Sequence, residues 1–231
     1  MGMIAILAAG IIAQAHNTLT PAEKDAGWQL LFNGKNMAGW NNYKSKGVSS
    51  GWVITDGVLR VADPGKAGDI ATEKKFDWFE LYVDFKLEKG QNSGIMFRVT
   101  DEGEAPWNSG PEVQIYDSQG QPGEQTGWLY NIYSSKVDAT KPVGQWNTFR
   151  IVVAPDKCFT EVNGVRYYEW KWDSKDFWER QKKTKFTEYP QYAKANSGRI
   201  AIQGDHGNVS FRNIKIRPIK AGRSGNGGII P

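Results

Sequence analysis

The chain has 231 residues, of which 39% are hydrophobic and 23% charged, a balance typical of a folded globular protein that excludes disordered and collagen-like chains. Its 29 lysines and arginines outnumber 25 aspartates and glutamates by a small excess spread along the chain, so charge gives no case for nucleic-acid binding. The one cysteine, Cys158, excludes an intramolecular disulfide and a cysteine-based zinc cluster, and its strand-like surroundings predict a buried thiol.

Residues 1–15 are predicted to be the remnant of an export signal. An apolar run over residues 3–15 ends in Ala13-Gln14-Ala15, a small-residue cleavage pattern. The positively charged start typical of such signals is missing, and a buried N-terminal helix is the alternative interpretation. No second run approaches the roughly 18 apolar residues of a transmembrane helix, so we expect an exported protein without a membrane span.

Apolar and polar residues alternate with a period of two through most of the chain, as expected for antiparallel strands with one buried face. One helical turn is predicted after Thr20, because Pro21 suits the first position of a helix. A hairpin over residues 52–61 turns at Asp56-Gly57, and a second over residues 158–168 turns at Asn163-Gly164. Further strands are predicted over residues 81–87, 95–99, 112–116, 149–153, 199–203 and 209–217.

Two local features refine this pattern. In the last strand the apolar residues change from odd-numbered to even-numbered positions between Phe211 and Ile214. This change of parity predicts a β-bulge near Arg212-Asn213. A charged stretch over residues 174–183 is the second helix candidate. Short strands at this spacing predict an all-β sandwich or barrel, as one domain over residues 16–220 followed by a flexible glycine-rich tail over residues 221–231.

Three of the predicted strands carry an unusual set of polar residues opposite their apolar ones. The residues of equal parity are Asn92, Gly94, Met96 and Arg98, then Glu112, Gln114 and Tyr116, then Ala201, Gln203 and Asp205. If these strands are neighbours, their shared face presents carboxylates, amides and a guanidinium, which together match the hydroxyls of a sugar. An ordinary solvated sheet face is the alternative.

His206 is the candidate proton carrier. The other histidine, His16, lies at the expected cleavage point, and an imidazole has an unperturbed pKa near neutrality. A purely structural hydrogen-bonding role is the alternative. Glu112, Asp205 and His206 could together hold a divalent metal ion, but no H-E-x-x-H or similar spacing supports one, and no other cofactor is indicated.

Several sequence blocks occur in a fixed order between about residues 25 and 219: Gly27–Trp40, Trp52–Leu59, Asn92–Arg98, Pro111–Asp117, Thr126–Tyr130, Gly144–Arg150, Asn163–Gly164, Gly198–His206 and Phe211–Ile216. These blocks resemble the 3-keto-disaccharide hydrolase family. The resemblance implies a concanavalin A-like jelly-roll sandwich of two curved antiparallel sheets. It also implies export to the periplasm or surface of a glycan-degrading bacterium, and a carbohydrate partner oxidised to a ketone at C3. The oligomeric state is left open, and because lectins and glucanases share the fold, the fold alone does not settle function.

The resemblance also implies which residues are functional: Asn92, Arg98, Glu112, Gln114, Asp117, Tyr130, Gln203, Asp205 and His206. In the mechanism it implies, a base removes the acidic proton at C2, the C1 substituent leaves, and water adds to complete hydrolysis. Glu112 and His206 are the base and acid in an open order, with Asp205 orienting His206. Arg98 or a divalent cation polarises the ketone, and the remaining residues bind the substrate.

Two other functions remain open on the sequence. A conventional glycosidase would pair Glu112 with Asp117 or Asp205, but an amide, Gln114, stands where strands of such enzymes carry a second acid. A non-catalytic glycan-binding module would need only the amides and aromatic rings, with His206 as a structural residue.

Overall fold

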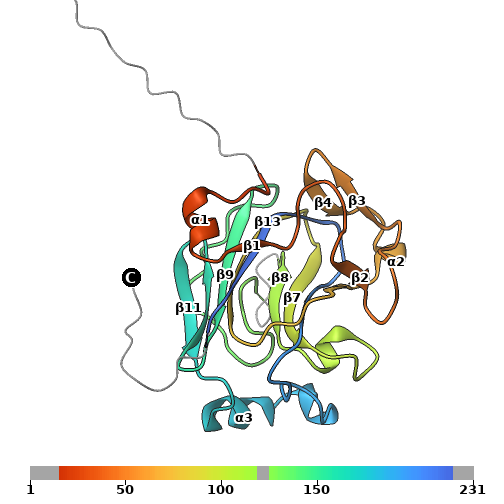
Figure 1. The fold of residues 1–231 in the computed structure, drawn as a ribbon. Coiled ribbons are helices and arrows are strands. Elements are labelled where there is room, and N and C mark those ends of the chain that lie inside the picture. Colours follow the sequence, from red (N-terminus) through yellow and green to blue (C-terminus); the bar gives the residue numbers. More distant parts are fainter. Residues whose placement is uncertain (1–15, 119–124, 221–231) are drawn as a thin grey trace, which may run out of the picture.

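The computed structural model describes residues 16–118 and 125–220, so the expected export segment and C-terminal tail lie outside the described residues. The described chain forms two antiparallel sheets packed as a sandwich (Figure 1). One sheet has eight strands in the order β11-β10-β9-β6-β13-β4-β3 with β1 paired to β13, and the other has five in the order β2-β5-β12-β7-β8. This architecture confirms the predicted all-β jelly-roll sandwich.

The strands agree closely with the alternation in the sequence. The larger sheet contains β1 (Gln29–Leu30), β3 (Trp52–Thr55), β4 (Val58–Val61), β6 (Phe79–Leu87), β9 (Asn147–Val153), β10 (Cys158–Val162), β11 (Val165–Trp170) and β13 (Val209–Pro218). The smaller sheet contains β2 (Trp40–Asn42), β5 (Ile70–Thr72), β7 (Asn92–Val99), β8 (Glu112–Tyr116) and β12 (Arg199–Ile202). Both predicted hairpins form, as β3-β4 and β10-β11, and their turn residues Asp56 and Asn163 have the positive φ that two-residue turns require.

Helices are short and lie outside the sheets. They are α1 (Pro21–Asp25), α2 (Pro64–Ala67), α3 (Lys175–Gln181) and two 3₁₀ turns, η1 (Pro106–Asn108) and η2 (Lys185–Glu188). The predicted first helix begins with a capping box, in which the Glu23 amide donates to the Thr20 hydroxyl at 3.2 Å while the Thr20 amide donates to the Glu23 carboxylate. No helix among the described residues is long and apolar enough to cross a membrane.

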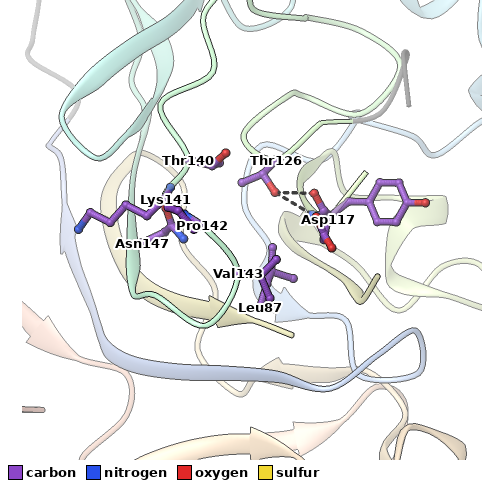
Figure 2. Close-up of a pocket in the computed structure, with 9 residues that line it drawn as sticks. Leu87, Asp117, Thr126, Thr140, Lys141, Pro142, Val143 and Asn147 are labelled. Atoms are coloured by element: carbon purple, nitrogen blue, oxygen red, sulfur yellow. Dashed lines mark hydrogen bonds between the residues drawn. The ribbon is translucent and has the colours of Figure 1, made fainter. Parts of the chain in front are cut away.

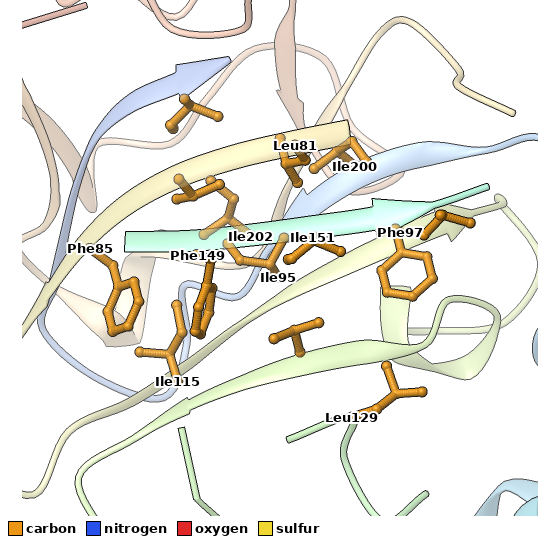
Figure 3. Close-up of a cluster of buried hydrophobic side chains, with 14 of the residues drawn as sticks. Leu81, Phe85, Ile95, Phe97, Ile115, Leu129, Phe149, Ile151, Ile200 and Ile202 are labelled. Carbon is orange, nitrogen blue, oxygen red and sulfur yellow. The ribbon is translucent and has the colours of Figure 1, made fainter. Parts of the chain in front are cut away.

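The core lies between the two sheets, where side chains of β6 and β9 meet those of β7, β8 and β12 (Figure 3). The side chains in contact there include Leu81, Phe85, Phe149, Ile151, Ile95, Phe97, Ile115, Ile200 and Ile202. Each is at most 1% exposed, and complete burial of such a side chain stabilises the fold by ~1.5–3 kcal/mol. Because side chains alternate along a strand, the residues between these apolar ones on β7, β8 and β12 face away from the larger sheet.

The predicted bulge in the last strand is confirmed. The register between β13 and β6 shifts between Arg212 and Lys215, and Asn213 takes a positive φ of 51°. Asn213 also exchanges hydrogen bonds with Asn17, which ties the start of the described chain to this strand. The thiol of Cys158 is fully buried, as predicted.

Candidate functional site

The outer face of the five-stranded sheet contains a polar pocket. The polar face expected from the sequence requires three neighbouring strands, and β12, β7 and β8 are neighbours in the structure. A cavity of about 310 Å³ lies over them. Its lining residues are Asn92, Trp107, Glu112, Gln114, Tyr130, Lys185, Phe186, Gln203, Asp205 and His206. The structure thus brings together seven of the nine residues expected from the sequence, namely all except Arg98 and Asp117.

The carboxylate of Glu112 is the most enclosed acid of the pocket, with only 6% of the residue exposed. It lies directly over Gly94 of the neighbouring strand, because a Cβ atom on Gly94 would come within 1.8 Å of Glu112 Oε1. The backbone of Glu112 is fixed on its other side, where the Tyr130 amide donates to its carbonyl at 2.9 Å. Gly94 therefore provides the space that this carboxylate occupies.

His206 and Asp205 form a hydrogen-bonded couple beside this carboxylate. Nδ1 of His206 contacts Oδ1 of Asp205, and this hydrogen bond is the largest cause of a raised pKa of the imidazole. The negative charges of Asp205, Asp69 and Glu112 add to the increase in pKa, while partial burial opposes it. The same hydrogen bond lowers the pKa of Asp205. The arrangement favours an imidazolium next to two carboxylates.

Asp69 lies behind this couple and carries no signal in the sequence. Its Oδ1 accepts a hydrogen bond from the Gly204 amide at 3.0 Å, and its carboxyl group is hydrogen-bonded to Asp205. Burial, followed by the charge of Asp205, raises the pKa of Asp69 to about 7. Asp69 therefore positions Asp205, which in turn contacts His206.

Two amide side chains offer acceptors to the pocket. Asn92 Oδ1 and Gln203 Oε1 are buried and have no hydrogen-bond partner among the described residues. The Gln203 backbone is held firmly, since its amide donates to the Gly94 carbonyl at 3.0 Å and its carbonyl accepts from the Ser93 hydroxyl at 2.7 Å. Buried acceptors of this kind are suited to hydroxyl donors of a ligand, because leaving them unpaired costs free energy.

Aromatic rings also line the pocket. Trp107 comes from η1 and Phe186 from η2, and sequence alternation could predict neither because both lie outside the strands. Phe186 stacks on the buried Tyr192 with ring centroids 4.1 Å apart. Burial, followed by the charge of Glu112, raises the pKa of the Tyr192 phenol, so this ring pair adjoins the carboxylate.

The predicted position of Arg98 on this face is wrong. Two residues of β7, Phe97 and Arg98, stand opposite the single residue Ile200 of β12, and Arg98 has a φ of +53°. This β-bulge reverses the parity and turns Arg98 away from the pocket. Its fully buried guanidinium lies between the rings of Trp78 and Trp172, at 4.2 and 3.9 Å.

The guanidinium of Arg98 is also tied to Asp77. It donates to the Asp77 carbonyl at 3.0 and 3.2 Å and to the Asp77 carboxylate at 3.1 Å. Burial lowers the pKa of Arg98 to about 10. Nε and Nη2 are bonded to Asp77, whereas Nη1 is buried without a hydrogen-bond partner among the described residues. Because this side chain is enclosed by rings and paired with Asp77, it acts in packing.

Asp117 is likewise separate from the predicted face. It lines a second cavity, of about 240 Å³, together with Leu87, Thr126 and Asn147. Figure 2 shows the residues around this cavity. The Asp117 carboxylate accepts a hydrogen bond from the Gly90 amide at 2.7 Å, which fixes the turn before β7. The alternation breaks at the end of β8, so parity could not place this residue.

The sequence left open a divalent metal ion held by Glu112, Asp205 and His206. Within residues 16–118 and 125–220, no three histidine, cysteine or acidic side chains are arranged so that they could hold a metal ion. Glu112, Asp205 and His206 therefore do not make such a group in this part of the chain.

A jelly-roll sandwich with a pocket of amides, acids and rings over its smaller sheet defines a carbohydrate-active protein of the glycosyl hydrolase kind. The pattern of the 3-keto-alpha-glucoside-1,2-lyase-like domain matches residues 27–217, so the chain belongs to this family of 3-keto-disaccharide hydrolases. A curated 3-keto-disaccharide hydrolase of Bacteroides thetaiotaomicron is 28% identical, over 89% of this chain and 82% of that protein.

Solved structures show the same relationship. A candidate glycosyl hydrolase from Parabacteroides distasonis superposes with a TM-score of 0.82 at 28% identity, covering 89% of this chain and all of that one. A second from the same organism has a TM-score of 0.63 at 32% identity, covering 83% of this chain and 99% of that one. The fold and the family are therefore shown over nearly the whole described chain.

Proposed function

We propose that this protein cleaves 3-keto-glycosides by removing the proton at C2, eliminating the C1 substituent and adding water. The observation that carries the proposal is the juxtaposition, in one pocket, of the buried carboxylate of Glu112 with the Asp205–His206 couple. The family of this chain supports the oxidised substrate class.

Glu112 is the base in this proposal. A ketone at C3 acidifies the C2 proton, so that a carboxylate positioned by Gly94 can accept it while the electron pair forms an enolate over C2, C3 and the ketone oxygen. Burial of Glu112 removes water that would compete for the carboxylate.

His206 is the acid. Asp205 and Glu112 raise its pKa, which favours the protonated imidazole that a leaving oxygen needs. As the C1–O bond breaks, its electron pair goes to that oxygen, which takes the proton of His206. Water then adds at C1 of the resulting enone and gives its second proton to the neutral imidazole of His206, which restores the acid. Protonated Glu112, after exchange with solvent, delivers a proton to C2. Asn92 and Gln203 accept hydrogen bonds from the sugar hydroxyls throughout.

A conventional glycosidase is less well supported. The second acid it needs must lie across the sugar from the first, and Asp117 lines a different cavity while Asp205 is paired with His206. A glycan-binding module would also account for polar groups and rings that converge in one pocket, and the absence of cleavage would distinguish it from the hydrolase.

The test compares a glucoside with the same glucoside oxidised at C3, following release of the aglycone by the purified protein. We expect release from the keto substrate alone, with a deuterium atom incorporated at C2 when the reaction is run in D2O. Glu112→Gln should lower kcat by about 10³-fold, within the range for loss of a general base.

Glu188→Gln is the matched control, because Glu188 is an exposed acid of η2 outside the pocket lining. It should retain full activity. Release from the unoxidised glucoside would support the conventional glycosidase, and binding without release from either compound would support the binding module.

A further inference from the structure

The elimination is accelerated by a positive charge or a hydrogen-bond donor at the C3 oxygen, where negative charge accumulates as the C2 proton leaves. Arg98 was expected to supply it, but its guanidinium is buried between Trp78 and Trp172 and does not line the pocket. Of the residues that line the pocket, Lys185 and His206 can carry a positive charge. His206 is held by Asp205 and is the proton donor to the leaving oxygen, which leaves the charge of Lys185 unassigned.

The position of Lys185 is set by the short 3₁₀ turn η2. The Thr184 hydroxyl accepts a hydrogen bond from the Phe186 amide at 3.1 Å, which starts the turn. Phe186, next in the chain, is 1% exposed and stacked on Tyr192, so it anchors the turn to the body of the protein. Lys185 thus extends from a fixed backbone although its side chain is solvent-accessible.

Two aromatic rings hold the ammonium group at the pocket. Lys185 Nζ lies 4.8 Å from the ring centroid of Trp107 and 5.1 Å from that of Tyr130, both of which line the pocket. Within the described residues, no carboxylate forms an ion pair with Lys185. An ammonium held by ring faces keeps its charge and can approach an anionic oxygen without first breaking an ion pair.

We propose that Lys185 binds the C3 carbonyl oxygen of the substrate and stabilises the enolate formed when Glu112 removes the C2 proton. This inference rests on the proposed function. The negative charge formed on the C3 oxygen lies against the ammonium in a partly enclosed site, where a fixed charge acts more strongly than in water. The proton remains on Lys185, and the electron pair returns to C2–C1 as the leaving group departs. Lys185 is therefore a further catalytic residue.

The test uses Lys185→Met, which keeps the length of the side chain and removes its charge. With the 3-keto-glucoside we expect kcat to fall about 10²–10³-fold, in the range for loss of one oxyanion-stabilising group, while KM changes by less than about threefold. Lys185→Arg should restore part of kcat, because it returns the charge. Lys183→Met, a change at an exposed lysine beside η2, should have no effect.

A second readout isolates the proton-transfer step. A 3-keto sugar without a leaving group at C1 can exchange its C2 proton for deuterium but cannot be cleaved. The wild type should catalyse this exchange, and Lys185→Met should slow it by the same factor as kcat. A variant that merely misplaces the leaving group would not slow it.

Two results would overturn this inference and leave the proposed function intact. The first is that Lys185→Met has the same kcat and exchange rate as the wild type. The second is that EDTA abolishes cleavage by the wild type, while Lys185→Met without EDTA is as active as the wild type. A wild type that neither cleaves the keto substrate nor exchanges its C2 proton would overturn the proposed function, and the role of Lys185 with it. Lys185→Gln provides a second charge-removing variant if the methionine variant is poorly soluble.

Discussion

The two ends of strand β7 differ in the environment of their polar side chains. At its first residue, Asn92 faces the pocket with a buried oxygen that has no partner among the described residues. Near its last residue, Arg98 is enclosed by two tryptophan rings and makes three hydrogen bonds to Asp77. One end keeps polar groups available for a ligand, whereas the other end pairs its charge within the protein.

Residues that serve the ligand and residues that stabilise the fold thus lie at different ends of one strand. Unpaired buried acceptors and neighbouring carboxyl groups cost free energy in the folded state, and that cost is tolerated where a ligand recovers it. A packed, paired guanidinium contributes to the fold instead. Substitutions at the pocket end should therefore reduce activity with little loss of stability, and substitutions at the Arg98 end should do the reverse.

The largest effect is expected for Gly94→Ala. The added methyl group would overlap the Glu112 carboxylate, and because the overlapped atoms are the end of a side chain, that carboxylate should move while the strand remains folded. We expect kcat on a 3-keto-glucoside to fall about 10³-fold or more, with an unchanged circular dichroism spectrum. Near-normal kcat would show that the position of this carboxylate does not matter. Gly65→Ala is the control, because Gly65 lies outside the pocket lining and an added Cβ there would make only an ordinary contact, 3.4 Å from Asp63 Oδ1.

Arg98→Met should have the opposite consequence. Removing the guanidinium from between Trp78 and Trp172 leaves a space and deprives Asp77 of its ion pair, so we expect the free energy of unfolding to fall by about 3 kcal/mol. The protein that remains folded at low temperature should keep its kcat. Urea unfolding and active-site titration measure the two quantities. A large loss of kcat at unchanged stability would return Arg98 to the list of functional residues.

The sequence predicted most of this arrangement because its main determinant is the alternation of side chains in neighbouring strands. Parity alone places Asn92, Glu112, Gln114 and Gln203 on one face, and the structure agrees. Parity failed for Arg98, since a bulge depends on the partner strand, which has one residue where β7 has two. The apolar residues Ile95, Phe97 and Val99 keep a period of two, so the sequence of β7 shows no sign of its bulge, unlike that of β13.

The site residues that the sequence did not predict lie outside the alternating strands. Lys185 and Trp107 come from 3₁₀ turns, and Asp69 precedes a three-residue strand, so none belongs to a periodic pattern. Their positions depend on tertiary contacts, such as the stacking of Phe186 on Tyr192 that anchors η2. A lysine in a charged loop is indistinguishable from its neighbours until those contacts are known.

A smaller effect is expected from pH at the pocket end. The pKa of Asp69 is raised from 3.8 to about 7 in the folded protein, so the folded state retains a proton that the unfolded state releases. The contribution of Asp69 to stability is therefore complete below about pH 4 and is lost as the pH rises to about 7. His206, whose pKa is also raised, adds a change of the same sign.

Asp69→Asn removes this titration and keeps an acceptor for the Gly204 amide. We expect its urea midpoint to differ less between pH 4.5 and pH 8 than that of the wild type, and to exceed the wild-type midpoint at pH 8. Asp63→Asn, an exposed acid in the same loop paired with Lys66, should leave the wild-type pH dependence in place. Equal pH dependence in wild type and Asp69→Asn would mean that Asp69 is ionised in the folded protein.

The smallest effect concerns the imidazole itself. Because the hydrogen bond that His206 donates to Asp205 is the largest cause of the raised pKa of His206, Asp205→Asn should lower that pKa and narrow the pH range in which the acid is protonated. NMR titration of the His206 ring protons measures the pKa directly, and the alkaline limb of the kcat profile on the keto substrate should move to lower pH with it. Asp101→Asn, whose carboxylate pairs with Arg199 outside the pocket lining, should shift neither. If the NMR pKa of His206 falls in Asp205→Asn but the alkaline limb of the kcat profile does not move, the proton donor is another group and His206 is a binding residue.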